Sequence, residues 1–437
     1  MTDEVLRHGE EPPVYDAKSY NPKMSRGCGL GLALSVVFIA ISIGGIIAVN
    51  AFLQKAHAPS RLMYFYSNVV DENRAISIAY ETSSSQYQLL LFDPKNGKIK
   101  WRSPIGDEYN IVQLQWGSDG LYTCDNQGII RLYNARDGSL EWEKDVGAVT
   151  YRPDHMVAHS RGLLFLGNDD VLRSINNKGR TLWERDMQSW RDFYLLKNTV
   201  VIDDSGNAIT GIQAKTGQTL WSIPVEARSI CSDSRSVFVL YSGSHWQDIN
   251  LVKINPAGKS LWQTTFPYKS FFSGTDSMVC FDRYIYIISD DTVWALNKSN
   301  GRVAGEPYIK GWEPLKIEET KGVLLILFEK SKGVTKLRLQ AFDAQDFSPK
   351  WSVSVPEENA MMEVAGGEVC VARETEDNSL EIKSFDLKNG KTLWRKELAD
   401  HDLTDMFTVR GSVVVVGMYF YTAFDAKTGE ELWNGLR

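Results

Sequence analysis

The sequence predicts an all-β fold, a β-propeller of eight or nine four-stranded blades preceded by one transmembrane helix. Three observations predict it. A motif that ends in tryptophan recurs roughly every 40 residues, short β-forming runs fill the spaces between its copies, and one long uncharged stretch lies near the N-terminus. A repeat of this length indicates units that stack side by side, because one unit alone has too little core.

The motif itself is typical of a hairpin. Its best copy has Asp425, then Gly429 four residues later, then Trp433 four residues after the glycine. The Asp side chain can accept hydrogen bonds from the N–H groups of the turn, and the glycine supplies a positive φ without steric cost. The tryptophan then lies on the strand after the turn, where its large apolar face can cover a neighbouring sheet.

Nine copies of the motif can be aligned, and two of them are irregular. The sixth has Gly305 where the tryptophan is expected, and the seventh has Phe347 in place of the glycine. Nine copies predict nine blades, or eight blades with one irregular unit. The tryptophan is kept in eight copies, at Trp101, Trp142, Trp183, Trp221, Trp262, Trp351, Trp394 and Trp433.

The segments between the copies supply the other strands. In the second unit, short β-forming runs lie at 111–116, 121–124, 129–133 and 140–143, separated by turn residues. Four runs in each unit predict a four-stranded meander. Because the chain begins and ends with whole units, we expect no exchange of strands where the ring closes.

The motif resembles the tryptophan-docking repeat of PQQ-like β-propellers, Ala-x-Asp-x-x-Thr-Gly-x-x-x-Trp. The segment from Ala423 to Trp433 matches it at every fixed position, and the resemblance covers about residues 63–437. It implies that each blade is a four-stranded antiparallel sheet with the tryptophan packed between blades. The chain is similar to BamB-type members of the family, which act as scaffolds in outer-membrane protein assembly. Those proteins carry a lipid on an N-terminal cysteine, whereas this chain has an apolar stretch.

The N-terminal region is predicted to anchor the propeller in a membrane. We expect a tail at 1–27, a transmembrane helix at 28–52, a linker at 53–62 and the propeller at 63–437. The stretch 29–49 has no charged residue, and as a helix it reaches roughly 30 Å, enough to span a bilayer. A cleaved signal peptide is disfavoured because the tail before the stretch is too long.

The basic residues around this stretch predict its orientation. The three nearest before it are Lys18, Lys23 and Arg26, and the two nearest after it are Lys55 and Arg61. This slight bias places the N-terminus in the cytoplasm. We therefore expect a single-pass signal-anchor protein with a periplasmic or other extracytoplasmic propeller, which would be lumenal in a eukaryote.

Charge and cysteine content limit the function further. The net charge of −7 argues against general nucleic-acid binding. Five cysteines in 437 residues do not make a disulfide scaffold. Cys231 and Cys280 fall on the first strands of neighbouring blades and can meet, but we expect buried free thiols.

The sequence predicts no enzyme and no cofactor or metal. PQQ-like propellers include quinoprotein dehydrogenases, which use calcium, an acidic base and usually two adjacent cysteines, and this chain has no adjacent cysteines. A ring of loop carboxylates can bind a cation, but we favour a turn-capping role for them. These carboxylates are Asp125, Asp169, Asp170, Asp203, Asp204, Asp290 and Asp291.

The favoured function is a protein-interaction scaffold, with a role in envelope protein assembly as one expectation. The alternatives are a quinoprotein-type oxidoreductase and a lumenal sensor or scaffold in a eukaryote. In a four-stranded meander, the loops between the second and third strands emerge on the same face as the links between blades. Aromatic residues in those segments are candidates for binding a protein partner: Trp190, Trp246, Tyr268 and Trp312.

Overall fold

The computed structural model describes residues 62–437 with short gaps, all within one compact unit that spans 60–437. The predicted tail, the predicted transmembrane helix and most of the linker therefore lie outside the described residues. In the part of the chain that is described, no helix is long and apolar enough to cross a membrane. The gaps are at 72, 107–110, 148–155, 168, 188–192, 205–207, 244–247, 268–276, 290–291, 331–335, 357–359, 376–378, 399–402, 418 and 437.

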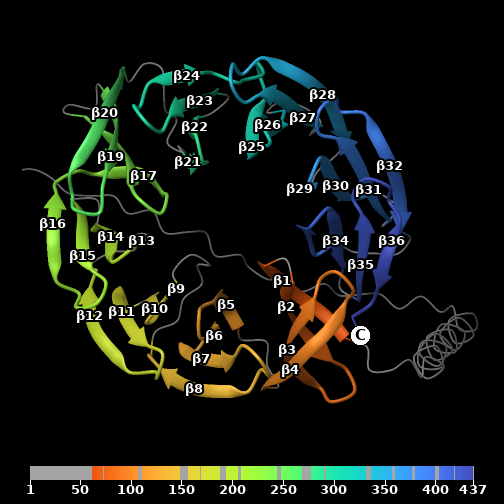
Figure 1. The fold of residues 1–437 in the computed structure, drawn as a ribbon, viewed down its shortest axis with the longest axis horizontal. Helices are drawn as coiled ribbons and strands as arrows, with labels where there is room; N and C mark the ends of the chain where they lie inside the picture. The colour runs from red at the N-terminus through yellow and green to blue at the C-terminus, as the bar shows by residue number, and fades with distance from the viewer. Residues whose placement is uncertain are drawn as a thin grey trace, which may run out of the picture. The chain divides into compact units, whose positions relative to one another are not determined.

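The described strands form nine antiparallel sheets, each built from four consecutive strands. Figure 1 shows the first strand of each sheet toward the centre of a ring and the fourth strand on its rim. The strands of blades 1 to 5 are β1 (Leu62–Asp71), β2 (Arg74–Glu81), β3 (Gln86–Asp93), β4 (Lys98–Gly106); β5 (Ile111–Trp116), β6 (Gly120–Asp125), β7 (Ile129–Asn134), β8 (Leu140–Asp145); β9 (Met156–His159), β10 (Gly162–Leu166), β11 (Val171–Asn176), β12 (Thr181–Asp186); β13 (Phe193–Leu196), β14 (Thr199–Asp204), β15 (Ala208–Gln213), β16 (Thr219–Ile223); β17 (Ala227–Ser232), β18 (Val237–Ser242), β19 (Asp248–Ile254) and β20 (Ser260–Pro267).

Blades 6 to 9 complete the ring, so the choice between eight and nine blades is decided in favour of nine. The sixth copy of the motif, which lacks its tryptophan, still makes a four-stranded blade, with a short fourth strand. The strands of blades 6 to 9 are β21 (Ser277–Cys280), β22 (Tyr284–Ser289), β23 (Thr292–Asn297), β24 (Val303–Gly305); β25 (Glu313–Thr320), β26 (Val323–Glu329), β27 (Lys336–Asp343), β28 (Pro349–Pro356); β29 (Met361–Ala365), β30 (Glu368–Glu374), β31 (Leu380–Asp386), β32 (Thr392–Leu398); β33 (Asp405–Val409), β34 (Ser412–Gly417), β35 (Phe420–Asp425) and β36 (Glu431–Asn434).

Each motif tryptophan docks onto the motif turn of the next blade. The indole N–H of Trp183, for example, donates to the carbonyl of Ala214 at 2.9 Å. The ring lies against the motif glycine, since a Cβ added to Gly217 would lie 2.8 Å from Cδ2 of Trp183. Gly217 also has a φ of +70°, so this position needs glycine both for its backbone and for the space above it. The resemblance predicted this packing between blades, and the structure confirms it.

The hydrophobic core is divided among the interfaces between blades. The described core residues form nine clusters, and each contains residues of two adjacent blades. The alternation of the strands explains this arrangement, because each sheet turns one face to the blade before it and the other to the blade after it. No blade has a core of its own, so stability depends on the stacking.

The ring closes by the same contact that joins its other blades. Trp433 of blade 9 donates its indole N–H to the carbonyl of Pro94 in blade 1 at 3.0 Å, and its ring lies against Gly97. Phe92 and Tyr421 meet edge to face across this interface, with ring centroids 5.4 Å apart. Blade 1 is made of β1 to β4 and blade 9 of β33 to β36. The prediction that closure needs no strand exchange is confirmed.

Trp433→Ala is expected to lower the free energy of unfolding by about 3–5 kcal/mol, the usual range for truncating a buried tryptophan. Its side chain is only 4% exposed at the interface that closes the ring. Urea unfolding followed by circular dichroism measures the change. The control is Leu432→Ala, one residue earlier and 46% exposed, which is expected to cost less than about 1 kcal/mol. Equal losses for the two variants would contradict the role given to Trp433.

Candidate functional site

The meander gives the propeller two distinct faces. The hairpins that join first to second strands and third to fourth strands emerge on one face, which we call the turn face. The loops between second and third strands and the links between blades emerge on the other, the loop face. Both follow from the strand order, and they separate the candidate sites described below.

Of the predicted partner-binding residues, only Trp312 belongs to the described residues. Trp190, Trp246 and Tyr268 lie outside them. Trp312 lies in the link from β24 to β25, and therefore on the loop face. Its ring is half-buried against the core between blades 6 and 7, and the guanidinium of Arg338 lies over it at 4.6 Å from the ring centroid. The side chain is held in place while part of its surface remains exposed.

Two of the loop aspartates, Asp125 and Asp169, accept hydrogen bonds from backbone N–H groups as turn caps do. Asp125 accepts from the backbone N–H of Ile129 at 2.8 Å and pairs with Arg131 at 2.7 Å. Asp169 pairs with Arg173. Within the described parts of the chain, no three His, Cys, Asp or Glu side chains gather as a metal site. Asp290 and Asp291 lie outside the described residues.

The innermost strands of blades 7 to 9 carry a short row of charged side chains. Lys316 on β25 lies 3.8 Å from Glu318 of the same strand and 3.1 Å from Glu363 on β29. Asp405 follows on β33. Burial raises the pKa of Asp405 to about 6, and the nearby carboxylate of Glu363 adds to the rise. This row places partly buried carboxylates at the centre of the ring.

Blades 5 and 6 are joined by a disulfide, so the expectation of free thiols is wrong for this pair. Cys231 on β17 is bonded to Cys280 on β21, with their Cα atoms 5.9 Å apart. The innermost strands of adjacent blades approach closely enough for this bond, which spacing along the chain does not determine. Cys124 and Cys370 are buried free thiols, as expected, and burial raises the pKa of both.

The interface between blades 6 and 7 reverses the docking arrangement. Gly305 pairs with Ala295 in the register that Trp433 has with Ala423, so it stands at the tryptophan position. Phe347 stands at the glycine position of the next turn with a φ of 59°. A Cβ added to Gly305 would lie 2.2 Å from Cδ2 of Phe347. The aromatic ring therefore comes from the turn and the glycine from the strand, and the two irregular copies compensate one another.

A cavity of about 450 Å³ opens on the turn face where blades 5, 6 and 7 meet. Three of its charged side chains, Asp233, Lys298 and Glu319, have polar partners. Lys298 pairs with Asp233 at 2.9 Å and donates to the carbonyl of Phe281 at 2.8 Å. Glu319 accepts a hydrogen bond from the hydroxyl of Tyr286 at 2.9 Å, while burial raises the pKa of this carboxyl.

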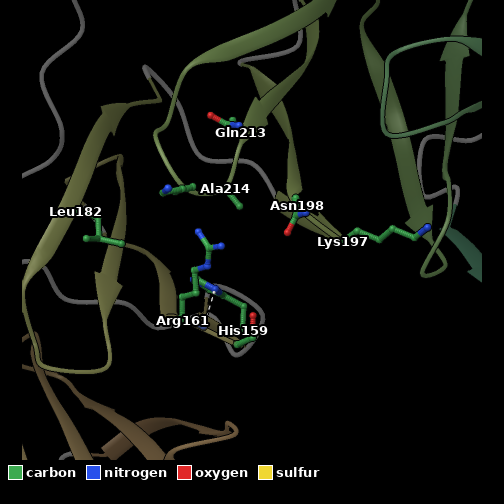
Figure 2. Close-up of a pocket in the computed structure, with 9 residues that line it drawn as sticks. His159, Arg161, Leu182, Lys197, Asn198, Gln213 and Ala214 are labelled. Atoms are coloured by element: carbon green, nitrogen blue, oxygen red, sulfur yellow. Dashed lines mark hydrogen bonds between the residues drawn. The ribbon is translucent and has the colours of Figure 1, made fainter.

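A second hollow, of about 150 Å³, lies on the turn face between blades 3 and 4, and we call it the turn-face groove. Ala214 forms its floor, where the carbonyl of that residue accepts the indole N–H of Trp183. Figure 2 shows the guanidinium of Arg161 reaching toward Ala214, while Lys197 extends away from the groove. The groove is lined by His159, Ser160, Arg161, Leu182, Lys197, Asn198, Gln213, Ala214 and Lys215.

The histidine of this groove is held as a neutral base. Nδ1 of His159 accepts the backbone N–H of Arg161 at 3.3 Å. Burial lowers the pKa of His159, and the neighbouring Arg161 lowers it further. The positive charges at the groove therefore belong to arginine and lysine side chains.

The sequence matches a family model described as outer membrane protein assembly factor BamB. The match covers residues 125–271 and 335–437, which together make more than half of the chain. The chain belongs to the PQQ-like β-propeller family. A search of the curated proteins finds no match to this member of the family.

Solved structures resemble this chain at low sequence identity. BamB from Moraxella catarrhalis is 14% identical with a TM-score of 0.46, covering 83% of this chain and 98% of that chain. Quinohemoprotein alcohol dehydrogenase from Comamonas testosteroni is 12% identical with a TM-score of 0.47, covering 70% of each chain. A eukaryotic initiation factor is 10% identical with a TM-score of 0.54, covering 77% and 88%. At such identity the last likeness shows the propeller fold alone.

Sequence reasoning missed both hollows on the turn face, namely the cavity where blades 5, 6 and 7 meet and the turn-face groove. The groove had a visible signal, because the hairpins around it contain basic residues and no Asp or Glu. The signal has meaning only once the propeller shows that these hairpins adjoin. The sequence allows the disulfide but does not favour it. It shows Gly305 and Phe347 as departures in two different copies of the motif, without showing that they meet.

Exchanging the two residues of the reversed interface is expected to restore stability that each single change removes. G305W alone forces a ring into the space of Phe347, and F347G alone leaves a void beside Tyr284, whose ring centroid lies 5.3 Å from that of Phe347. Each is expected to cost about 2–4 kcal/mol. The double variant rebuilds the regular docking pair, with the Ala344 carbonyl at the acceptor position. Urea unfolding of all four proteins should give a coupling energy of about 2 kcal/mol or more; strictly additive losses would contradict the compensation.

Asp405→Asn is expected to stabilise the protein at neutral pH but not near pH 4. The pKa of the Asp405 carboxyl is raised to about 6 in the folded protein. The protonated carboxyl therefore contributes stability at low pH, and the protein loses this stability as the pH rises from about 4 to 6. Removing the ionisable group should therefore add about 1–2 kcal/mol at pH 7. Thermal unfolding across this pH range measures the effect. Asp425→Asn is the control, because hydrogen bonds from the turn lower the pKa of that carboxyl and its loss should not stabilise the protein at neutral pH.

Proposed function

We propose that this PQQ-like propeller is a non-enzymatic scaffold that binds a protein partner outside the cytoplasm, anchored by a transmembrane helix within residues 28–52. The observation that carries the proposal is the match, over more than half of the chain, to a family described as outer membrane protein assembly factor BamB. A closed ring of nine stacked sheets is a rigid body that presents loops at fixed positions, as a scaffold requires.

The disulfide supports the proposed compartment. Structural disulfides persist in oxidising environments such as the periplasm or a secretory lumen, and they are rare in the cytosol. The Cys231–Cys280 bond joins two blades, and the propeller would lack this link in a reducing compartment. Its position agrees with a chain whose N-terminus stays in the cytoplasm while the propeller is exported.

The loop face is the proposed partner-binding surface. The link that carries Trp312 and the loops between second and third strands meet there, and the described turn at 82–85 is exposed. Trp312 is held in place by Arg338, so its exposed edge is presented at little further cost in side-chain entropy. Trp190, Trp246 and Tyr268 are proposed to join it because each follows a described strand that ends toward the loop face: β12, β18 and β20.

The test is capture of the partner by the intact protein from its own membrane. A W190A/W246A/W312A variant should remain folded and lose its cross-linked partner, because aromatic side chains dominate the binding energy of most interfaces. The matched control is L220A/L261A/L432A, which removes side chains that are 52%, 49% and 46% exposed on the outer strands. The control should keep the partner.

Two results would count against the proposal. A folded tryptophan variant that retains its partner would remove the loop face from the interface. A wild-type protein that captures no partner, yet carries a bound quinone by its absorbance, would favour an oxidoreductase over a scaffold.

A further inference from the structure

The turn face of blades 3 and 4 concentrates positive charge in a protein whose net charge is −7. Four hairpins adjoin there, at 159–162, 176–180, 197–198 and 213–218, and none of them contains an Asp or a Glu. They carry five exposed basic residues, and none of the five has an ion pair within the described part of the chain. The five are Arg161, Lys178, Arg180, Lys197 and Lys215.

The motif turns of these two blades keep their caps without a carboxylate. In blade 9, Oδ1 of Asp425 accepts the hydroxyl of Thr428 at 3.0 Å. In blade 4, Oε1 of Gln213 accepts the hydroxyl of Thr216 in the same way at 2.7 Å. In blade 3, Oδ1 of Asn176 accepts the backbone N–H of Arg180 at 3.0 Å. Neutral amides thus do the structural work of the motif aspartate, so these two turns add no negative charge of their own to offset the basic side chains.

The turn-face groove lies among these hairpins and can receive one small group. Arg161 reaches over its floor (Figure 2), and Lys215 and the amide of Asn198 belong to its lining. A guanidinium, an ammonium and a side-chain amide are all donors suited to an anion's oxygens. The cavity where blades 5, 6 and 7 meet differs, because Lys298 is already paired with Asp233 there and two further carboxylates, Asp282 and Glu319, line it.

We propose that the turn-face groove binds a phosphate group, held by Arg161, Lys215 and Asn198, with the other basic side chains of the four hairpins attracting it. Phosphate fits better than a single carboxylate, because several unpaired cations match a dianion and because arginine and lysine are both common phosphate ligands. The phosphate can belong to a free small molecule or to a lipid headgroup of the phosphomonoester type. The site is independent of the proposed partner surface, which lies on the opposite face.

The experiment is calorimetric titration of the intact protein, purified in a non-ionic detergent, with inorganic phosphate at low salt. Saturable binding is expected. R161Q/K215Q should weaken it roughly tenfold or more, because both lost side chains are charged hydrogen-bond donors to the anion. K388Q/K427Q is the matched control, because it removes two positive charges from exposed lysines at the motif position of Lys215. Its affinity for phosphate should stay within about twofold of the wild type, because these two lysines belong to blades 8 and 9 and lie outside the four basic hairpins.

A second titration distinguishes the sources of the phosphate. Mixed micelles that contain phosphatidic acid should bind more tightly than inorganic phosphate if a lipid headgroup is the ligand, and no more tightly if it is a free molecule; phosphatidylcholine micelles should not bind. The proposal is overturned if phosphate does not saturate, if both double variants lose affinity equally, or if a polyglutamate peptide binds at Arg161 and Lys215 more tightly than either phosphate source.

Discussion

The whole propeller depends on one contact, in which an indole side chain packs on the backbone of the next blade. Each motif tryptophan makes a directional bond from its N–H to a turn carbonyl, from 3.2 Å for Trp101 to 2.8 Å for Trp394. Each indole ring also needs a residue without a side chain beneath its face, and only glycine meets this need. The hydrogen bond orients the ring, and the ring fills the space between adjacent sheets. Because every interface between blades is filled by an aromatic ring packed on a glycine of the adjacent blade, no blade has a complete core without its neighbours.

The reversed interface shows which part of this contact is essential. Between blades 6 and 7 the hydrogen bond from an indole is absent, yet an aromatic ring still lies on a glycine, with Phe347 packed edge to face against Tyr284. Phe347 adopts a positive φ to do so, a backbone conformation that L residues rarely adopt. The packing of a ring on a glycine is therefore kept at an interface that lacks the indole hydrogen bond, consistent with the large apolar area of an aromatic side chain. The disulfide on the other side of blade 6 adds a covalent link next to the interface that lacks the regular docking pair.

Much of the fold was predictable because the motif encodes local and interblade structure together. The Asp, Gly and Trp of a copy such as Asp425, Gly429 and Trp433 define a turn and its docking ring, and nine copies gave the blade count to within one. The sequence could not show that Gly305 and Phe347 occupy one interface, since their departures from the motif fall in different copies. It also could not show that Cys231 meets Cys280, because a separation of 49 residues is compatible with many distances. The basic hairpins become a groove only when blades 3 and 4 are placed side by side.

Because the ring closes without strand exchange, it forms only when blade 9 docks on blade 1. The bond from Trp433 to Pro94 joins residues 339 positions apart, so it carries a larger chain-closure entropy than the bonds between consecutive blades, which span about 31 to 36 positions. During synthesis the earlier blades can stack as they emerge, because each needs only its predecessor. Until the last strand is complete, the assembly is an open arc with the apolar sides of blades 1 and 9 facing water. The strand that carries Trp433 closes that arc into a ring. A chain that ends before this strand keeps two exposed apolar edges, on blades 1 and 9.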